Sequence, residues 1–543
     1  MKYFLTLVLG ALSPAVSSAS TNGNIHSFQH QCTALSRTLR APNTEVILSE
    51  FVASGVKLTF PESANNTCPK SVISLADICR LRLNTTTSST SSVITEVFMP
   101  VDWESKGKRR FLMGGNGGNG GCIPYGDLAF GNRLGFAAVG HDNGHAGDTS
   151  VPFRNNPQVL EDHIYRALFV AGRVAKVAVR TFYNRPISKS YYWGCSAGGR
   201  QGMKAAQDFP DEYDGILAVA PALYEQALNG QASTYFKLTG PPGSPTFLSV
   251  DQWKRVHRMV IDQCDWIDGV LDGVLEDPMK CQPRPEALLC GAGQTWDSHR
   301  CLTAKQVNTV REFYSPLYGT NGQFIAPRMN PLTREFLGFR VNYGGSPGPL
   351  AEGWYQDVLF NDPSWTIANN FSLATIDYDM QVDKYGVGTN KTDLSALRDS
   401  GGKLLLYHGL VDGLITSELS YHYYGNVVRD MGARPEELDQ FFRFFPISGL
   451  DHCFTGEGPW FVGGPVQTDV RGALNIDPEQ GALMKLVRWV ENGTAPETLM
   501  GYKLINGTVH GKREHCKYPK KTVYRGVGDP DLPSSWKCSD AFV

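Results

Sequence analysis

The stretch Gly194-Cys195-Ser196-Ala197-Gly198 decides the fold of this chain. It has the form G-x-S-x-G, in which a serine sits on a tight turn between a strand and a helix and presents its hydroxyl. The apolar run before it, residues 190–193, indicates a buried strand, and a helical pattern follows to about residue 213. The glycines fit such a turn, because a Cβ there would strike the neighbouring strand. We therefore predict that Ser196 is a nucleophile, with a purely structural turn as the alternative.

A serine hydroxyl attacks well only when a base takes its proton, and an acid must orient that base. In folds that carry this motif, the acid and then the histidine follow the serine along the chain. The acid candidate is Asp412, in the loop after the apolar run 403–407, and the base candidate is His452, beyond the strand-like run 441–447. Both follow the carboxyl ends of predicted strands, where open α/β sheets carry their chemistry.

Other residues compete for these two roles. His408, His141 and His145 also lie in loops that follow predicted strands. Asp451 adjoins His452, but neighbouring residues in an extended segment point in opposite directions, which makes Asp451 a poor orienting partner. The spacing therefore favours the pair Asp412 and His452.

Strand-like runs alternate with helical patterns over much of the chain, which predicts an α/β fold with a mostly parallel sheet between two helical layers. With the serine motif, this predicts the α/β-hydrolase fold. The strand-like runs are residues 93–99, 110–113, 136–139, 191–194, 216–219, 404–407 and 442–445, and the clearest helical patterns are residues 159–182 and 482–492.

The strand pattern stops after Pro221 and resumes near Lys403. The block between them is rich in Pro, Gly, Trp and Cys, and an insertion before the acid-bearing strand would lie above the nucleophile as a lid. The 543 residues are enough for two domains. We predict a catalytic domain of residues 20–222 and 396–543 and a lid domain of residues 223–395.

Residues 1–19 predict a signal peptide, because one basic residue is followed by an apolar stretch and a small-residue end. No later stretch is long and apolar enough to span a bilayer. The 12 cysteines are an even number, which in an exported chain implies disulfides. We therefore expect a secreted glycoprotein that starts at Ser20, with acceptor asparagines at Asn65, Asn84, Asn370, Asn390, Asn492 and Asn506.

The charge pattern argues against some partners. The 51 basic and 53 acidic residues are interspersed and give a net charge of −2, so we expect no nucleic acid partner, and no membrane partner either. The cysteines show no paired C-x-x-C spacing, which disfavours a zinc site.

A glycine-rich run, residues 114–121, follows the predicted strand 110–113. It lacks the Gly-Lys-Ser/Thr ending of a phosphate-binding loop. In α/β-hydrolases the loop at this place gives one backbone amide to the oxyanion hole, and the residue after the nucleophile gives the other. We expect Ala197 to be one donor and Gly115, Asn116 or Gly117 to be the other. A flexible surface turn is the alternative.

Two cysteines flank the proposed catalytic residues: Cys195 precedes Ser196, and Cys453 follows His452. If the catalytic residues meet, a disulfide between these cysteines would tie the serine turn to the histidine loop. The alternatives are two unrelated bridges, or Cys195 itself as the nucleophile. The second is disfavoured because Ser196 occupies the position of the nucleophile in the motif.

Three parts of the sequence carry a family resemblance: the run 194–202, Tyr407-His408-Gly409 with Asp412, and His452-Cys453. In these parts the chain resembles the tannase and feruloyl esterase family of fungi and bacteria, most closely its fungal type B feruloyl esterases. The resemblance extends from Cys32 to Cys538. It implies Ser196 as the nucleophile, Asp412 as the acid and His452 as the base. It also implies the disulfide pairs Cys195–Cys453, Cys32–Cys79, Cys68–Cys122, Cys264–Cys281, Cys290–Cys301 and Cys516–Cys538.

An acidic loop within the lid block, residues 265–277, carries carboxylates at spacings of three and four residues, with glycines between them. Such a loop suits a hard cation that binds oxygen ligands, or is simply solvated. The family resemblance implies a structural calcium ion held by the side chains of Asp265, Asp268 and Asp272 and by the carbonyls of Val270 and Val274. We expect no organic cofactor.

The resemblance implies two-step hydrolysis of hydroxycinnamate esters in plant cell-wall polysaccharides. A tannase that cleaves gallate esters and a hydrolase-fold binding protein without catalysis are the alternatives. A planar phenolic acyl group needs an apolar slot with a few polar groups. Aromatic residues of the lid block either line that slot or fill the core; they are Trp253, Phe313, Tyr314, Tyr343, Trp354, Tyr355 and Trp365.

Overall fold

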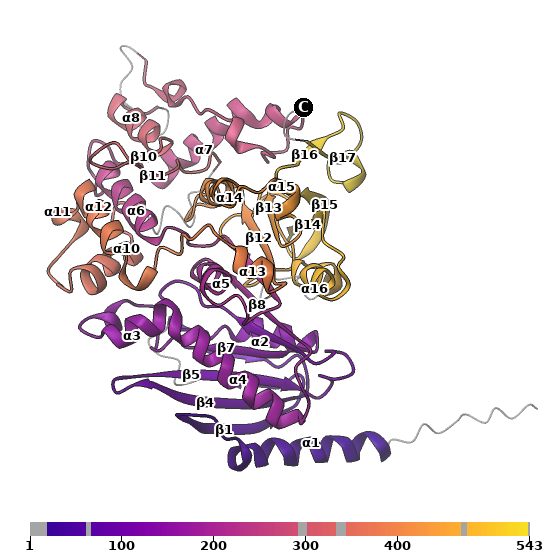
Figure 1. Cartoon of the computed structure of the whole chain (residues 1–543). Helices are drawn as coiled ribbons and strands as arrows, with labels where there is room; N and C mark the ends of the chain where they lie inside the picture. The colour runs from indigo at the N-terminus through magenta and orange to yellow at the C-terminus, as the bar shows by residue number, and fades with distance from the viewer. Residues whose placement is uncertain (1–18, 61–66, 292–300, 333–343, 469–474, 541–543) are drawn as a thin grey trace, which may run out of the picture.

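A nine-stranded sheet runs through the centre of the protein, in the order β1-β4-β5-β7-β6-β8-β9-β12-β13 (Figure 1). The computed structural model describes residues 19–60, 67–291, 301–332, 344–468 and 475–540. All the predicted strand-like runs lie in this sheet. Its strands are β1 (Thr44–Val52), β4 (Ile78–Ser88), β5 (Ser91–Pro100), β6 (Arg110–Gly114), β7 (Ala137–His141), β8 (Lys189–Cys195), β9 (Gly215–Val219), β12 (Lys403–Gly409) and β13 (Phe442–Ile447).

The sheet is parallel where the candidate catalytic residues lie. Strands β7, β6, β8, β9, β12 and β13 pair in parallel in that order. Strands β1, β4 and β5 extend the sheet in antiparallel pairing, and β5 joins the parallel part by an antiparallel pairing with β7. Parallel strands need long crossover connections, which are usually helical. The prediction of an α/β fold with a mostly parallel sheet is confirmed.

Helices cover both faces of the sheet and form two apolar cores. Successive residues of β8 enter opposite cores: Tyr192 packs with the helices α4 (Ala167–Tyr183) and α5 (Ala197–Asp208), whereas Tyr191 and Trp193 pack with α16 (Ala482–Asn492). Side chains of a strand alternate between the two faces of its sheet. Because both faces are buried, these strands are continuous apolar runs, which made them visible in the sequence.

Two helical predictions were wrong in their bounds. The helix after Ser196 ends at Asp208 and does not continue to residue 213, because Pro210 disfavours a helical conformation at the residue before it. The pattern over residues 159–182 is not one helix. It is divided into α3 (Pro157–Glu161), a π-helical turn (Asp162–Arg166) and α4.

In the segment between β9 and β12, none of the described residues adds a strand to the central sheet. It gathers on one side of the molecule, at the upper left of Figure 1. The predicted domain boundaries at residues 223 and 395 stay a prediction. The elements of this segment include α6 (Glu225–Thr239), α7 (Val250–Cys264), α8 (Ala304–Phe313), β10 (Leu317–Tyr318), β11 (Phe324–Ala326), α10 (Pro349–Gly353), α11 (Ile367–Asn370) and α12 (Leu373–Val382).

The two ends of the described chain lie outside this plan. Helix α1 (Ala19–Thr38) packs on β1, and the predicted signal peptide up to residue 18 lies outside the described residues. After α16 come two hairpins, β14 (Thr498–Ile505) with β15 (Thr508–Cys516), and β16 (Lys521–Tyr524) with β17 (Trp536–Ser539). Among the described residues, no helix has the length and apolar character needed to cross a membrane.

Candidate active site

Ser196 sits between the end of β8 and the start of α5, on the turn that the sequence motif predicts. Its backbone has φ 64° and ψ −123°, a conformation that is costly for a residue with a side chain. The turn is held by backbone bonds: Ser196 N–H donates to the Val219 carbonyl at 3.0 Å, and Ala222 N–H donates to the Ser196 carbonyl at 3.1 Å. Ser196 is therefore fixed between two neighbouring parallel strands.

The glycines around Ser196 are required by crowding. A Cβ on Gly194 would lie 2.5 Å from the Gly198 carbonyl oxygen, and a Cβ on Gly199 would lie 2.3 Å from the Val219 carbonyl oxygen. A Cβ on Gly198 would lie 2.9 Å from the carbonyl oxygen of Asn116. The glycine-rich loop after β6 thus packs directly against the serine turn.

Asp412 and His452 form a buried hydrogen-bonded pair. His452 Nδ1 lies 2.7 Å from Asp412 Oδ2, and the Asp412 side chain is fully buried. The other oxygen, Asp412 Oδ1, accepts the backbone N–H groups of Leu414 and Ile415 at 2.8 and 2.9 Å. Asp412 is therefore fixed by its own loop and holds the imidazole of His452 in one orientation.

The charges of this pair shift their pKa values in opposite directions. Burial alone would raise the pKa of Asp412, but the charge of His452 and the hydrogen bonds from His408 and His452 hold it below its usual range. Burial alone would lower the pKa of His452, but the Asp412 carboxylate raises it above its ordinary value. The geometry thus favours a carboxylate beside a basic imidazole.

His408, which the sequence offered as a competing base, contacts the acid instead. Its Nε2 atom lies 3.1 Å from Asp412 Oδ2 and 3.0 Å from the Ile415 carbonyl, and its Nδ1 atom lies 2.7 Å from Ser420 Oγ. Its place four residues before Asp412, at the end of a strand, was the sequence signal for this role.

Asp451 has a structural role in the histidine loop. Its Oδ1 atom accepts the backbone N–H of His452 at 2.7 Å and that of Gly413 at 3.2 Å. It therefore joins the loop of the acid to the loop of the histidine without contacting the imidazole.

The Cys195–Cys453 disulfide joins the serine turn to the histidine loop, with a Cα–Cα distance of 5.9 Å. Ser196 directly follows Cys195, and His452 directly precedes Cys453. The bridge therefore keeps the serine turn and the histidine loop side by side. Because Cys195 is oxidised, it is not available as a nucleophile. The structure contains all the pairs implied by the resemblance: Cys32–Cys79, Cys68–Cys122, Cys195–Cys453, Cys264–Cys281, Cys290–Cys301 and Cys516–Cys538.

The glycine-rich loop leaves one of the three candidate oxyanion donors free. Gly115 N–H donates to the Trp193 carbonyl at 2.9 Å, and Asn116 N–H donates to Gln201 Oε1 at 3.0 Å. Among the hydrogen bonds of the described residues, none uses the N–H of Gly117. Of the three, Gly117 is therefore the remaining candidate, and its role as an oxyanion donor stays a prediction.

A pocket opens at Ser196 between the sheet and the inserted segment. Its wall includes Ser196 and Ala197 from the serine turn and Leu350 and Trp354 from the insertion. Of the lid aromatics considered from the sequence, Trp354 lines this pocket. Tyr343 lies outside the described residues, and the others pack in the apolar cores of the insertion: Trp253, Phe313, Tyr314, Tyr355 and Trp365.

Comparison with known proteins identifies the family of the chain. The sequence model of the family described as "Tannase and feruloyl esterase" matches residues 79–539. The chain belongs to the tannase and feruloyl esterase family. It is 42% identical over 514 residues to a "Probable feruloyl esterase B" of Emericella nidulans, which covers 94% of this chain and 95% of that protein.

Solved structures share the fold of this chain. The crystal structure of feruloyl esterase B from Aspergillus oryzae matches with a TM-score of 0.89 and 41% identity, over 94% of this chain and 100% of that chain. A tannin acyl hydrolase from Aspergillus niger matches with a TM-score of 0.71 and 19% identity, over 94% of this chain and 95% of that chain. The second likeness shows the shared fold alone.

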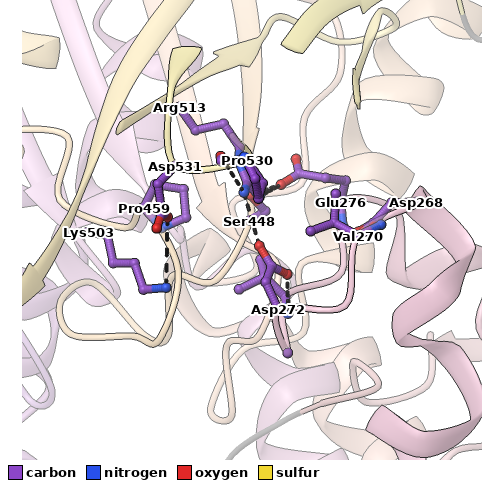
Figure 2. Close-up of polar contacts among 12 residues, drawn as sticks. Asp268, Val270, Asp272, Glu276, Ser448, Pro459, Lys503, Arg513, Pro530 and Asp531 are labelled. Carbon is purple, nitrogen blue, oxygen red and sulfur yellow. Dashed lines mark hydrogen bonds and ion pairs between the residues drawn. The ribbon is translucent and has the colours of Figure 1, made fainter. Parts of the chain in front are cut away.

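The acidic loop for which the tannase and feruloyl esterase family implied calcium lies between α7 and the C-terminal hairpins (Figure 2). Arg513 from β15 reaches between two of its carboxylates, with Nη2 at 3.1 Å from Asp272 Oδ2 and a contact from Nη1 to Glu276. The Oδ1 atom of Asp265 accepts the Gly273 N–H, and the two oxygens of Asp268 accept backbone N–H groups.

The donor set of this loop fits a hard cation in its chemistry, because Asp265 and Asp268 bind only backbone amides in the contacts described and have oxygen lone pairs left. The side chains are not gathered for it: across the described residues no group of three or more His, Cys, Asp or Glu side chains is arranged to hold a metal ion.

The acceptor asparagines differ in exposure. Asn370, Asn390, Asn492 and Asn506 are exposed, whereas Asn84 is half-buried within β4 of the sheet. Asn65 lies outside the described residues. The four exposed asparagines have room for a glycan.

Proposed function

We propose that this protein is a secreted serine esterase that hydrolyses hydroxycinnamate esters, feruloyl esters in particular, of plant cell-wall polysaccharides. The proposal rests on the buried contact between His452 Nδ1 and Asp412 Oδ2 at 2.7 Å, beside the serine turn to which the histidine loop is bridged. The acyl group follows from the relatives that are named feruloyl esterase B and cover nearly the whole chain.

In the first step, Ser196 Oγ bonds to the ester carbonyl carbon while His452 Nε2 takes the serine proton. Asp412 stabilises the imidazolium that forms. The carbonyl oxygen gains negative charge and accepts the N–H groups of Ala197 and Gly117. His452 then gives its proton to the sugar oxygen, the carbon–oxygen bond of the ester breaks, and the alcohol leaves an acyl-enzyme.

In the second step, water replaces the alcohol. His452 takes a proton from the water, and the hydroxide bonds to the acyl carbon. The collapse of this second intermediate returns the proton to Ser196 and releases the hydroxycinnamic acid. The same donors stabilise both intermediates, so neither step needs an organic cofactor.

We also propose that the enzyme is secreted and glycosylated. The six disulfides favour an oxidising compartment, which supports removal of a signal peptide and secretion. Glycans on the exposed acceptor asparagines fit the same route. Neither a nucleic acid nor a membrane is part of the proposed reaction.

We also propose that calcium binds the acidic loop and stabilises the inserted segment. Val270 and Val274 would add carbonyl ligands to the carboxylates of Asp265, Asp268 and Asp272. Such an ion would fix the loop that the Cys264–Cys281 bridge closes. Chelation of the purified protein should lower its melting temperature, and added calcium should restore it. An unchanged melting temperature, with no calcium found by elemental analysis, would contradict the proposal.

The function is tested by hydrolysis of methyl ferulate, caffeate, p-coumarate and sinapate beside methyl gallate, with the wild type and Ser196→Ala. We expect turnover of the cinnamates that the substitution abolishes. Faster turnover of gallate would make the protein a tannase with the same catalytic residues. A folded protein that hydrolyses none of these esters would contradict the proposed function and favour a binding protein.

A further inference from the structure

Arg200, Glu225 and Asn229 are among the polar side chains that line the pocket of Ser196 and that the proposed chemistry does not use. Arg200 follows Ser196 by one turn of α5, and Glu225 and Asn229 lie one turn apart on α6, so they share a face of that helix. Arg200 and Asn229 are 1% and 6% exposed. The pocket therefore has a buried polar region beside its apolar walls.

These three side chains are incompletely paired. Arg200 Nε lies 3.7 Å from Glu225 Oε2, which is an ion pair but too long for a hydrogen bond. Within the described part of the chain, Arg200 Nε, Glu225 Oε2 and Asn229 Nδ2 are buried atoms without a hydrogen-bond partner. Unsatisfied buried polar groups are costly and rare in folded proteins. A ligand that completes their hydrogen bonds accounts for them.

Burial also shifts the pKa values of Arg200 and Glu225 toward their uncharged forms. Burial lowers the pKa of Arg200, although the charge of Glu225 opposes this. Burial raises the pKa of Glu225, although the charge of Arg200 opposes this. Each charge only partly compensates the other, so a polar group placed between or beside them would be strongly bound.

The rest of the pocket suits a flat ring. Leu228 and Leu350 contribute apolar walls, and Trp354 contributes an aromatic one. The indole of Trp354 is fixed because its Nε1 donates to Asp379 Oδ2 at 2.8 Å. An aromatic acyl group whose ester carbonyl is at Ser196 would lie between these walls.

We propose that Glu225 and Asn229, with Arg200 holding the carboxylate, bind the phenolic hydroxyl at the far end of the acyl group. Glu225 Oε2 accepts the phenolic hydrogen, and Asn229 Nδ2 donates to the phenolic oxygen. The inference rests on the proposed esterase function and deepens it: these residues select acyl groups with a free para-hydroxyl. They bind the substrate and take no part in bond breaking.

The test compares kcat/KM for three esters: methyl p-coumarate; methyl cinnamate, which lacks only the hydroxyl; and methyl 4-methoxycinnamate, in which a methyl group replaces the hydroxyl hydrogen. Because a hydrogen bond to a charged group is involved, we expect the wild type to prefer p-coumarate by about 10- to 100-fold over either analogue. Equal rates for the three esters would overturn the inference while leaving the esterase function in place. No hydrolysis of any of them would count against the function itself.

Two variants test whether Asn229 and Glu225 cause the preference for methyl p-coumarate. Asn229→Leu keeps the size of the side chain and breaks no side-chain hydrogen bond among those described, so it should fold normally. Glu225→Gln keeps the shape and removes the charge. Each should reduce the preference for p-coumarate by about fivefold or more, mainly through the rate on p-coumarate. The control Leu350→Ala, in the apolar wall, should lower kcat/KM for p-coumarate and cinnamate by the same factor. Unchanged preference in both variants would overturn the inference.

Discussion

His408 Nε2 lies 3.1 Å from Asp412 Oδ2, the same carboxylate oxygen that accepts a hydrogen bond from His452. The carbonyl of Ile415, 3.0 Å from the same Nε2 atom, only accepts hydrogen bonds, so Nε2 carries the hydrogen. The other ring nitrogen, Nδ1, lies 2.7 Å from Ser420 Oγ. His408 is therefore a hydrogen-bond donor that holds Asp412 in place next to His452.

Substitution His408→Gln should lower kcat on methyl ferulate by about tenfold, because Asp412 loses one charge-assisted hydrogen bond. KM should stay unchanged, since His408 lies outside the substrate pocket. The effect should be far smaller than that of Asp412→Asn, for which a loss of about 10⁴ in kcat is expected. Steady-state kinetics of the two variants check this order. Equal losses in both would mean that His408 has a role beyond holding the acid.

The pH dependence of kcat/KM should report His452. This residue must be neutral to accept the proton of Ser196, so kcat/KM falls as the pH drops through the pKa of His452. Burial opposes its charge, but Asp412 raises this pKa above the ordinary value of 6.5. The midpoint of the acidic limb should therefore lie above pH 6.5. A midpoint at or below that value would contradict the geometry of the pair.

Asp451 offers a matched variant for this pH dependence. Burial and the charge of Asp412 raise the pKa of Asp451 to about 6, so it is ionised in the range where His452 titrates. Its charge also raises the pKa of His452. The substitution Asp451→Asn removes this charge, keeps an acceptor for the backbone, and should move the acidic limb to lower pH.

Removal of the Cys195–Cys453 bridge should affect catalysis as well as stability. The double substitution to alanine frees the histidine loop from the serine turn, so we expect kcat to fall by about tenfold or more. The free energy of unfolding should fall by about 2–5 kcal/mol. The control is the double alanine variant of Cys290 and Cys301. The Cys290–Cys301 bridge spans a sequence separation of 11 residues, whereas the Cys195–Cys453 bridge spans 258.

The control variant should lose less stability, because its loop is short, and should keep its kcat. Thermal unfolding and turnover of methyl ferulate measure both properties on the same preparations. If the two double variants lose kcat equally, the bridge beside Ser196 has no special role in catalysis.

Two substitutions at Gly117 should distinguish the contribution of its backbone N–H to catalysis from the effect of adding a side chain. A Cβ at this position meets no atom within 4 Å, so Gly117→Ala should keep activity. Gly117→Pro removes the N–H group and should lower kcat by about 10²–10³ with little change in KM. If the proline variant is folded and fully active, the second oxyanion donor is another group.

The central sheet could be predicted where burial on both faces made the strands continuously apolar, as in β8, β9 and β12. Strand β4 escaped prediction because Arg80 is buried within it, 2.7 Å from the buried carboxylate of Glu96 on β5. In the sequence this charged residue resembles a solvent-facing one. Such a strand is recognisable only when its partner across the sheet is known.

The sequence singled out Ser196, Asp412 and His452 because the chemistry demands particular residue types at strand ends, and the structure brings Asp412 and His452 into contact. The choice among Gly115, Asn116 and Gly117 was not predictable, because it depends on which amides the surrounding fold already uses. Among the lid aromatics, Trp354 lines the pocket and Tyr355, its neighbour in the chain, fills a core. Composition cannot separate these roles, since both suit a large apolar side chain.

Covalent labelling of the native protein with a fluorophosphonate, followed by mass spectrometry of its peptides, is the most direct test of Ser196 as the nucleophile. We expect a single label on Ser196, absent from Ser196→Ala and formed much more slowly in His452→Ala. A label on a different serine, or no label on a folded wild-type protein, would contradict this role of Ser196.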